Sequence, residues 1–126
     1  MASWISGAGA VSCFGLGKGL FFKALKEGES GIDSNGLGYV PESARRALEE
    51  SWCAGRTWPM QMALWAAREA MNEAGWDQLR PNDGLILATT TGQILLWDQP
   101  LKKYYHREMS EIDFQAVFKH YPLGTL

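Results

Sequence analysis

The sequence has little cysteine or histidine, no excess of positive charge and no long apolar run. Its 126 residues include two cysteines, Cys13 and Cys53, too few for a disulfide framework or a cysteine-rich metal site. Lysine and arginine number 12 against 14 acidic residues, so the net charge of -2 gives no electrostatic footprint for nucleic acid. The densest basic cluster, Lys102, Lys103 and Arg107, is typical of a solvated face.

The lack of long apolar runs also bears on location. No run approaches the length of a membrane span, and the N-terminus lacks the basic start and apolar centre of a signal peptide. With so little cysteine, this pattern predicts a reduced, cytoplasmic protein without a membrane partner. The length fits one ordinary domain, and a composition of 46% hydrophobic and 21% charged residues is that of a globular protein.

Glycine, in contrast, is abundant near the start of the chain. The stretch SGAGAVSCFGLGKG, Ser6 to Gly19, holds five glycines in fourteen residues. Residues 4–11 (WISGAGAV) predict a short buried strand whose glycines let another backbone come close. Residues Gly17–Glu27 predict a helix, which Gly28 is well placed to end.

Two further helices are expected in the middle of the chain. Pro41–Glu50 predicts a short helix with Pro41 in its first turn. Trp58–Ala74 predicts a longer helix that begins after a Thr57 cap, and its alanine-rich stripe would let it lie close against a sheet. On its other side, Glu69 and Glu73 have the like-charge spacing of a solvated face and are not expected to form a catalytic dyad.

The last third predicts a strand and a helix. Leu85–Thr91 is a continuous apolar and β-branched run, typical of a strand buried on both faces, whereas Gln93–Pro100 is apolar without clear periodicity. Ser110 is expected to open a final helix, with Asp113 placed for a capping-box contact. Strands that alternate with helices indicate an α/β fold. Because two strands make no stable sheet alone, the chain is expected to be part of a larger layer.

A dinucleotide site is one possible use of the glycines. Gly7 and Gly9 fit the Gly-x-Gly-x-x-Gly fingerprint, but Ser12 takes the third position. No second strand is predicted between Phe22 and Asp33, where the fingerprint requires one. The pattern therefore predicts that the glycines serve packing and bind no nucleotide.

Four segments resemble β-ketoacyl synthases, in the order of that family. Ile5–Ile32 (ISGAGAVSCFGLGKGLFFKALKEGESGI) is similar to the first strand, glycine-rich turn and first helix. Ala63–Asp77 (ALWAAREAMNEAGWD) is similar to the alanine-rich helix. Gly84–Gln93 (GLILATTTGQ) resembles a strand that ends in a Thr/Gly turn, and Tyr121–Leu126 (YPLGTL) resembles the segment that introduces the next helix.

The resemblance implies that residues 1–126 are the N-terminal portion of a thiolase-like layered α/β fold, with helices packed on a mixed sheet, incomplete as given. Such enzymes condense acyl and malonyl units held on acyl carrier protein, in fatty acid or polyketide biosynthesis. They use a cysteine nucleophile and a histidine pair. In the family these groups follow the last matched segment, so we expect no catalytic residue in this chain. No cofactor or metal is implied.

The chain's own cysteines and histidines are interpreted as structural. Cys13 lies in the glycine-rich turn, at a position that the family fills with small residues, and Cys53 lies in a loop with no basic neighbour before Arg56. His106 and His120 match neither histidine motif of the family. None of them is expected to replace the missing site.

One turn carries the site prediction. Thr91 and Gly92 match the family turn that borders the acyl pocket near the dimer interface. We expect these residues, together with Ile94 and Leu95, to line that pocket or interface. The alternative is that the three threonines merely end a strand, as β-branched residues do.

A second function stays open. The chain could be a non-catalytic half-synthase or a chain-length-factor-like partner subunit that acts by association. Whether it is a truncation, a proteolytic product or a natural short protein is also open at this point. Under either function we expect self-association or a complex with the remainder of the synthase, because the two predicted strands need neighbours.

Overall fold

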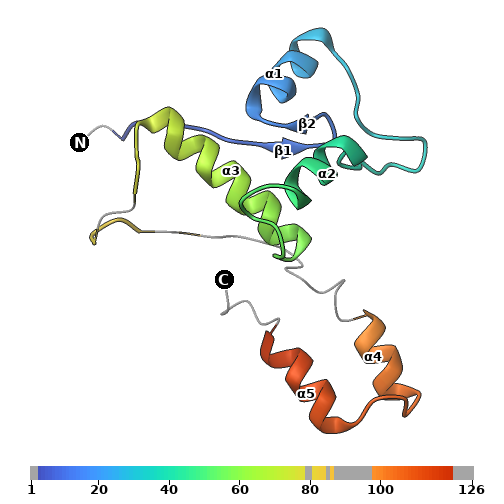
Figure 1. The fold of residues 1–126 in the computed structure, drawn as a ribbon. Coiled ribbons are helices and arrows are strands. Elements are labelled where there is room, and N and C mark those ends of the chain that lie inside the picture. Colours follow the sequence, from blue (N-terminus) through green and yellow to red (C-terminus); the bar gives the residue numbers. More distant parts are fainter. Residues whose placement is uncertain (1–2, 79–80, 85, 87–97, 121–126) are drawn as a thin grey trace. The chain divides into compact units, whose positions relative to one another are not determined.

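A computed structural model of the chain describes residues 3–78, 81–84, 86 and 98–120. The chain divides into two units, Met1–Asp83 and Gly84–Leu126. The first unit contains, in order, β1 (Val11–Ser12), β2 (Gly15–Leu16), α1 (Lys18–Glu27), α2 (Glu42–Glu49) and α3 (Trp58–Ala74). The second contains α4 (Asp98–Tyr105) and α5 (Glu111–His120) (Figure 1). The described part is therefore rich in helix, with one small antiparallel sheet.

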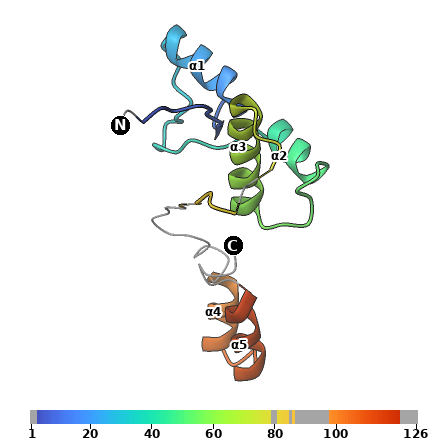
Figure 2. The same ribbon diagram turned by 90° about the vertical axis from the view of Figure 1, so that its left-hand side faces the viewer.

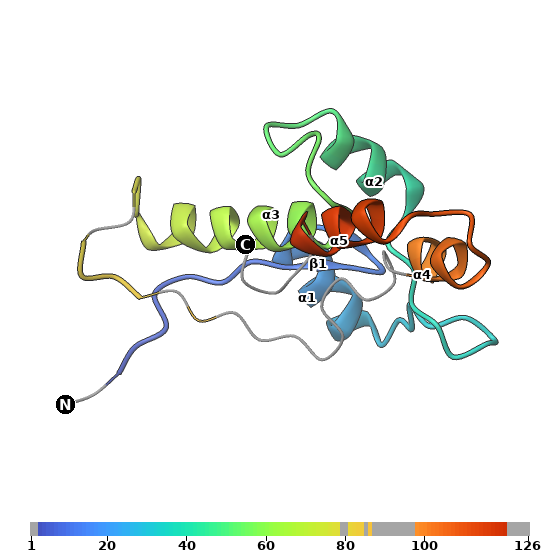
Figure 3. The same ribbon diagram turned by 90° about the horizontal axis from the view of Figure 1, so that it is seen from below.

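The glycine-rich stretch, Ser6 to Gly19, forms two strands of two residues each, β1 and β2. In the β1–β2 hairpin, Val11 lies opposite Leu16 and Ser12 opposite Gly15. Residues 3–10 run alongside α3 without a strand partner (Figures 1 and 3). Trp4 and Ile5 are 86% and 92% exposed. The prediction of a strand over residues 4–11 buried on both faces is therefore wrong, because no neighbouring strand of the described residues lies beside residues 3–10.

The helices of the first unit follow the predicted bounds closely. α1 ends at Gly28 and α3 ends at Gly75, and both glycines adopt the left-handed conformation, with φ of 69° and 71°. Glycine adopts this conformation without steric cost and so ends both helices. α2 forms within the predicted range, with Pro41 at the cap position before it instead of in its first turn. Figure 2 shows α2 beside α3.

The start of α3 differs from its prediction in one detail. Thr57 occupies the cap position, but its side chain donates or accepts no capping hydrogen bond, and its Oγ1 is buried without a partner. A capping side chain bonds to the second or third backbone N–H of the helix. Pro59 is the second residue of α3 and has no N–H, which removes one of these two donors.

The core of the first unit is small. Its buried hydrophobic side chains, among the described residues, are Ala24, Ala44, Leu48 and Cys53. They come from α1, α2 and the loop after α2. Several large apolar side chains of the same unit remain exposed, among them Trp4, Ile5 and Phe22.

In the second unit, Ser110 begins α5 as predicted. Its Oγ donates to Asp113 Oδ2 over 2.6 Å and accepts from the Asp113 N–H over 3.2 Å. Helix α4 was not predicted, since Gln93–Pro100 lacks helical periodicity. The rings of Tyr104 and Phe114 stack at 4.4 Å and join α4 to α5.

The second predicted strand, Leu85–Thr91, lies almost entirely outside the described residues. Of its members the structure describes Ile86, which is 95% exposed and in no strand. Lys102, Lys103 and Arg107 are exposed, as the prediction of a solvated face requires.

Candidate functional site

The four predicted pocket residues, Thr91, Gly92, Ile94 and Leu95, lie outside the described residues. The structure therefore leaves this site as a prediction. The candidate site among the described residues is a different one, formed where the glycine-rich segment meets α3.

Two glycines allow that meeting. A methyl group at Gly7 would overlap the carbonyl oxygen of Ala70, and one at Gly9 would overlap that of Ala66. The backbone of the extended segment thus lies directly on the backbone of α3. The prediction that these glycines let another backbone come close is confirmed, with a helix in the role of the neighbour.

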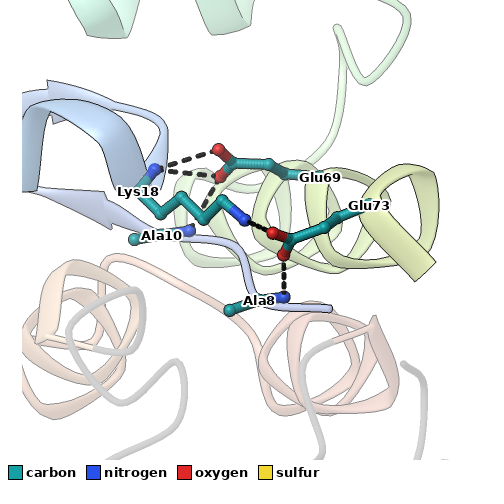
Figure 4. A network of polar contacts seen from close by, with 5 residues as sticks. All are labelled: Ala8, Ala10, Lys18, Glu69 and Glu73. Carbon is teal, nitrogen blue, oxygen red and sulfur yellow. Dashed lines mark hydrogen bonds and ion pairs between the residues drawn. The ribbon is translucent and has the colours of Figure 1, made fainter. Parts of the chain in front are cut away.

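The two glutamates of α3 bind the same segment (Figure 4). The Ala8 N–H donates to Glu73 Oε2 over 2.7 Å, and the Ala10 N–H donates to Glu69 Oε2 over 2.9 Å. The Lys18 N–H donates to both oxygens of Glu69, at 3.0 and 3.2 Å. The Lys18 ammonium forms an ion pair with Glu73. We call these five residues, Ala8, Ala10, Lys18, Glu69 and Glu73, the carboxylate clamp.

The spacing of the clamp follows from the geometry of helix and strand. Four residues of a helix rise about 6 Å, and two residues of an extended chain advance about 6.6 Å. Carboxylates at positions i and i+4 therefore match amides at positions j and j+2. Gly7 lies at Ala70 and Gly9 at Ala66, so the segment runs antiparallel to α3. The glycine contacts and the carboxylate contacts share this register.

The clamp also supplies the cap of α1. Gly17 precedes α1 and has no side chain to bond its first amides, and no side-chain cap is formed by the helix's own residues. Glu69 accepts the first of these amides from 51 residues away. A negative charge at a helix N-terminus also interacts favourably with the helix dipole. A phosphate bound at this helix start would need the position that the Glu69 carboxylate takes, which is a physical argument against the nucleotide alternative.

The electrostatics of the clamp favour the ionised form of the Glu73 carboxylate. The Lys18 ammonium, followed by the Ala8 amide, lowers the pKa of Glu73 from its ordinary value. The Glu73 side chain is 44% exposed and that of Lys18 is 27% exposed, so water screens part of their attraction.

The prediction of a solvated face holds for Glu73, which is exposed, and fails for Glu69, which is half-buried; both carboxylates nevertheless bind the glycine-rich segment. By spacing alone, two like-charged residues four apart on a helix look the same whether they face water or bind another segment. The signal that could have found the clamp was the match between two glycines two residues apart and two small residues four apart on a later helix. Such a match places a strand backbone on a helix, within reach of neighbouring carboxylates.

Neither cysteine takes part in the hydrogen bonds or the ion pair of the carboxylate clamp. Cys53 is buried, and its sulfur lies 3.0 Å from Ser51 Oγ and 3.8 Å from the Leu48 carbonyl oxygen. Cys13 is half-buried beside Gly31, and His106 is exposed. The side chain of His120 lies outside the described residues. A nucleophilic cysteine requires a base or a positive charge beside its thiol. Among the interactions of the described residues, neither thiol has one.

A groove of about 430 Å³ lies beside Glu69. The residues that line the groove are Leu16, Gly17, Trp52, Trp65, Arg68, Glu69 and Asn72. The Arg68 guanidinium lies over the Trp52 ring, 4.7 Å from the ring centre. Because the Glu69 carboxylate is already bonded to backbone amides, Arg68 is the charged group that this groove presents.

Two further properties can be stated for the described residues. No group of three or more His, Cys, Asp or Glu side chains among them is placed to hold a metal ion. None of the described helices is long and apolar enough to cross a membrane.

Comparison with known proteins identifies no relative: no family model, no curated protein and no solved structure matches this chain.

Proposed function

We propose that this chain is the N-terminal portion of a β-ketoacyl synthase, an acyltransferase that condenses acyl and malonyl units carried by acyl carrier protein. The observation that supports the proposal best is the contact between the two longest resembling segments. Ile5–Ile32 and Ala63–Asp77 are separate in the sequence, and the carboxylate clamp joins them. A shared family origin explains why both segments occur together, since they bind each other through the clamp.

In this proposal the chain has a structural role. It contributes the glycine-rich segment, helices α1 and α3 and the clamp that joins them, within a thiolase-like layered fold. The cysteine nucleophile and the histidine pair belong to the remaining part of the synthase. Thr91, Gly92, Ile94 and Leu95 would form one wall of the acyl pocket or part of the dimer interface. The proposed setting is the cytoplasm, where acyl carrier protein presents the substrates.

The exposed apolar surface supports the idea of an incomplete fold. Trp4 and Ile5 lie next to the glycine-rich segment and are almost fully exposed. In a layered fold further strands and helices pack against such a segment and would cover both side chains. A large exposed apolar patch commonly marks a surface that another part of the protein or a partner protein covers.

The proposal is tested by the coding sequence and by an assay. We expect the open reading frame to continue past Leu126 into a cysteine motif and two histidine motifs. The longer product should form ketoacyl product from acyl- and malonyl-carrier protein, whereas residues 1–126 alone should form none. Product from residues 1–126 that is lost on Cys13→Ser or Cys53→Ser substitution would overturn the proposal.

The second candidate is a non-catalytic partner subunit, and the same exposed apolar side chains favour it. A stop codon directly after Leu126 would select this candidate. The chain should then co-purify with a complete synthase subunit and alter the length of its product. A chain that neither binds such a subunit nor changes its product would exclude this function.

A further inference from the structure

The three asparagines of the chain differ in the residue that follows each. Asn35 precedes a glycine, whereas Asn72 and Asn82 precede acidic residues. An asparagine side chain is chemically labile where the backbone nitrogen of the next residue can reach its amide carbon. A glycine in that next position places no side chain in the way of the approach. Asn35–Gly36 is therefore the asparagine position most open to this reaction.

The structure places Asn35 and Gly36 in a turn between α1 and α2. Both residues are exposed, and a methyl group added at Gly36 would meet no other part of the described structure within 4 Å. Asn72 is exposed as well, but it lies inside α3, where backbone hydrogen bonds hold the nitrogen of the next residue in the helix. Backbone conformation, and not exposure, therefore separates these two asparagines.

Asp33 organises the turn through its carboxylate. Its Oδ1 accepts from the Asn35 N–H over 2.8 Å and from the Leu37 N–H over 3.0 Å. Aspartate commonly forms such bonds to the backbone that follows it in a turn. The Leu37 N–H, as the largest influence, lowers the pKa of Asp33 from its ordinary value, which favours the ionised carboxylate.

The same residue also holds the two groups of Asn35–Gly36 that would react. The Gly36 N–H donates to the Asp33 carbonyl oxygen over 3.0 Å. The Asn35 Nδ2 donates to Asp33 Oδ2 over 3.4 Å. The nucleophile and the leaving group are thus both bonded to Asp33 while the turn is formed.

We propose that Asn35 is a site of deamidation and that the turn formed by Asp33 restrains the reaction. In the formed turn the Gly36 N–H proton is held by a carbonyl oxygen, and the nearby carboxylate opposes the negative charge that the nitrogen must acquire. Both restraints are lost whenever the turn opens, and exposed loops with few buried contacts open at low cost in free energy. The inference depends on residues 33–37 alone and does not rest on the proposed function.

The reaction needs only water and hydroxide. Hydroxide removes the Gly36 amide proton, and the nitrogen attacks Asn35 Cγ. The N–Cγ bond forms, the Cγ–Nδ2 bond breaks, and ammonia leaves after Nδ2 takes a proton from water. Water then opens the resulting cyclic imide: attack at Cγ gives an aspartate at this position, and attack at the backbone carbonyl carbon gives an isoaspartate.

Either product prevents the turn from forming again as it was. The new carboxylate replaces the Nδ2 donor that faces Asp33, so a hydrogen bond is exchanged for repulsion between like charges. The isoaspartate also adds a methylene group to the backbone between Asp33 and Leu37, whose hydrogen bonds close the turn. Deamidation would therefore open the connection between α1 and α2 irreversibly.

Site-resolved mass spectrometry tests the proposal. The chain is incubated at neutral pH, folded and in urea, and each asparagine is followed by the mass gained when an amide becomes a carboxylate. Asp33→Ala should raise the rate at Asn35 at least fivefold, toward the rate in urea. Glu29→Ala is the matched control: it removes the same charge from the same exposed connection, outside the turn, and should leave the rate unchanged.

Two further readings separate the turn from unfolding and from charge. Asn72 should stay unmodified in the folded variants, which shows that α3 is intact. Asp33→Asn keeps an acceptor for the backbone amides without the charge, so its rate at Asn35 should lie between those of the unchanged chain and Asp33→Ala. Equal Asn35 rates in the unchanged chain and in Asp33→Ala, or an equal rise in Glu29→Ala, would overturn the role of the turn. If Asn35 reacts no faster than Asn72 in Asp33→Ala, the site itself is refuted.

Discussion

Glu69 is the residue whose removal should affect this fold most specifically. Its carboxylate is the shared acceptor of the Ala10 and Lys18 amides, and thereby holds the glycine-rich segment on α3 and caps α1. Glu69→Ala leaves both half-buried amides without an acceptor. Hydrogen bonds to charged groups stabilise by about 1.5–3 kcal/mol each, and two of them at the low end of that range give a loss of about 3 kcal/mol.

Glu69→Gln should cost roughly half as much, because the amide oxygen still accepts one hydrogen bond but carries no charge for the start of α1. Urea unfolding followed by circular dichroism measures both losses. With a slope of about 1–3 kcal/mol/M, the midpoint of Glu69→Ala should fall by at least about 1 M. The control is Glu27→Ala at the exposed end of α1, which should stay within about 0.5 kcal/mol of the unchanged chain.

Amide hydrogen exchange gives the local test. In Glu69→Ala the protection of the Ala10 and Lys18 amides should fall about 100-fold, the factor that corresponds to 3 kcal/mol. The amides of α5, in the other unit, should keep theirs. If Glu69→Ala unfolds like the unchanged chain and both amides stay protected, the carboxylate does not hold the segment and the reasoning is refuted.

Four other substitutions test the packing and the charge of the first unit. Gly9→Ala should lower the free energy of unfolding by at least about 2 kcal/mol through overlap with α3, whereas Gly19→Ala, with open space around it, should raise it by about 0.5 kcal/mol. Opposite signs in thermal unfolding would support the close contact, and equal effects would contradict it. Because Lys18 and the Ala8 amide lower the pKa of Glu73 below its ordinary 4.5, its stabilising effect should be complete above that pH and lost as the pH falls through the lowered pKa. The difference in urea midpoint between the unchanged chain and Glu73→Gln should therefore shrink on acidification; a constant difference would exclude the charge as its cause. Leu48→Ala, at a fully buried side chain, should cost about 2–5 kcal/mol in the same urea assay, and a loss below about 1 kcal/mol would show that the small core contributes little.

The helices of this protein were predictable because their signals are local. Gly28 and Gly75 end α1 and α3 at the expected residues, and Ser110 with Asp113 begins α5. Each signal acts through backbone conformation or through hydrogen bonds within one helical turn. Thr57 shows the limit of such signals, since a proline two residues later removed one of the donors that its side chain needed.

The two features that define the candidate site required the tertiary structure. The spacing of Glu69 and Glu73 on their helix was visible in the sequence, but what they face depends on a segment some 60 residues earlier. The sequence likewise predicted that Gly7 and Gly9 permit a close backbone contact, without indicating that the neighbour is a helix. By itself the sequence therefore determined where the helices begin and end and which residues are small enough for close contact. Tertiary structure alone decided which groups meet in the clamp, because the partners of a carboxylate are set by long-range packing and not by neighbours along the chain.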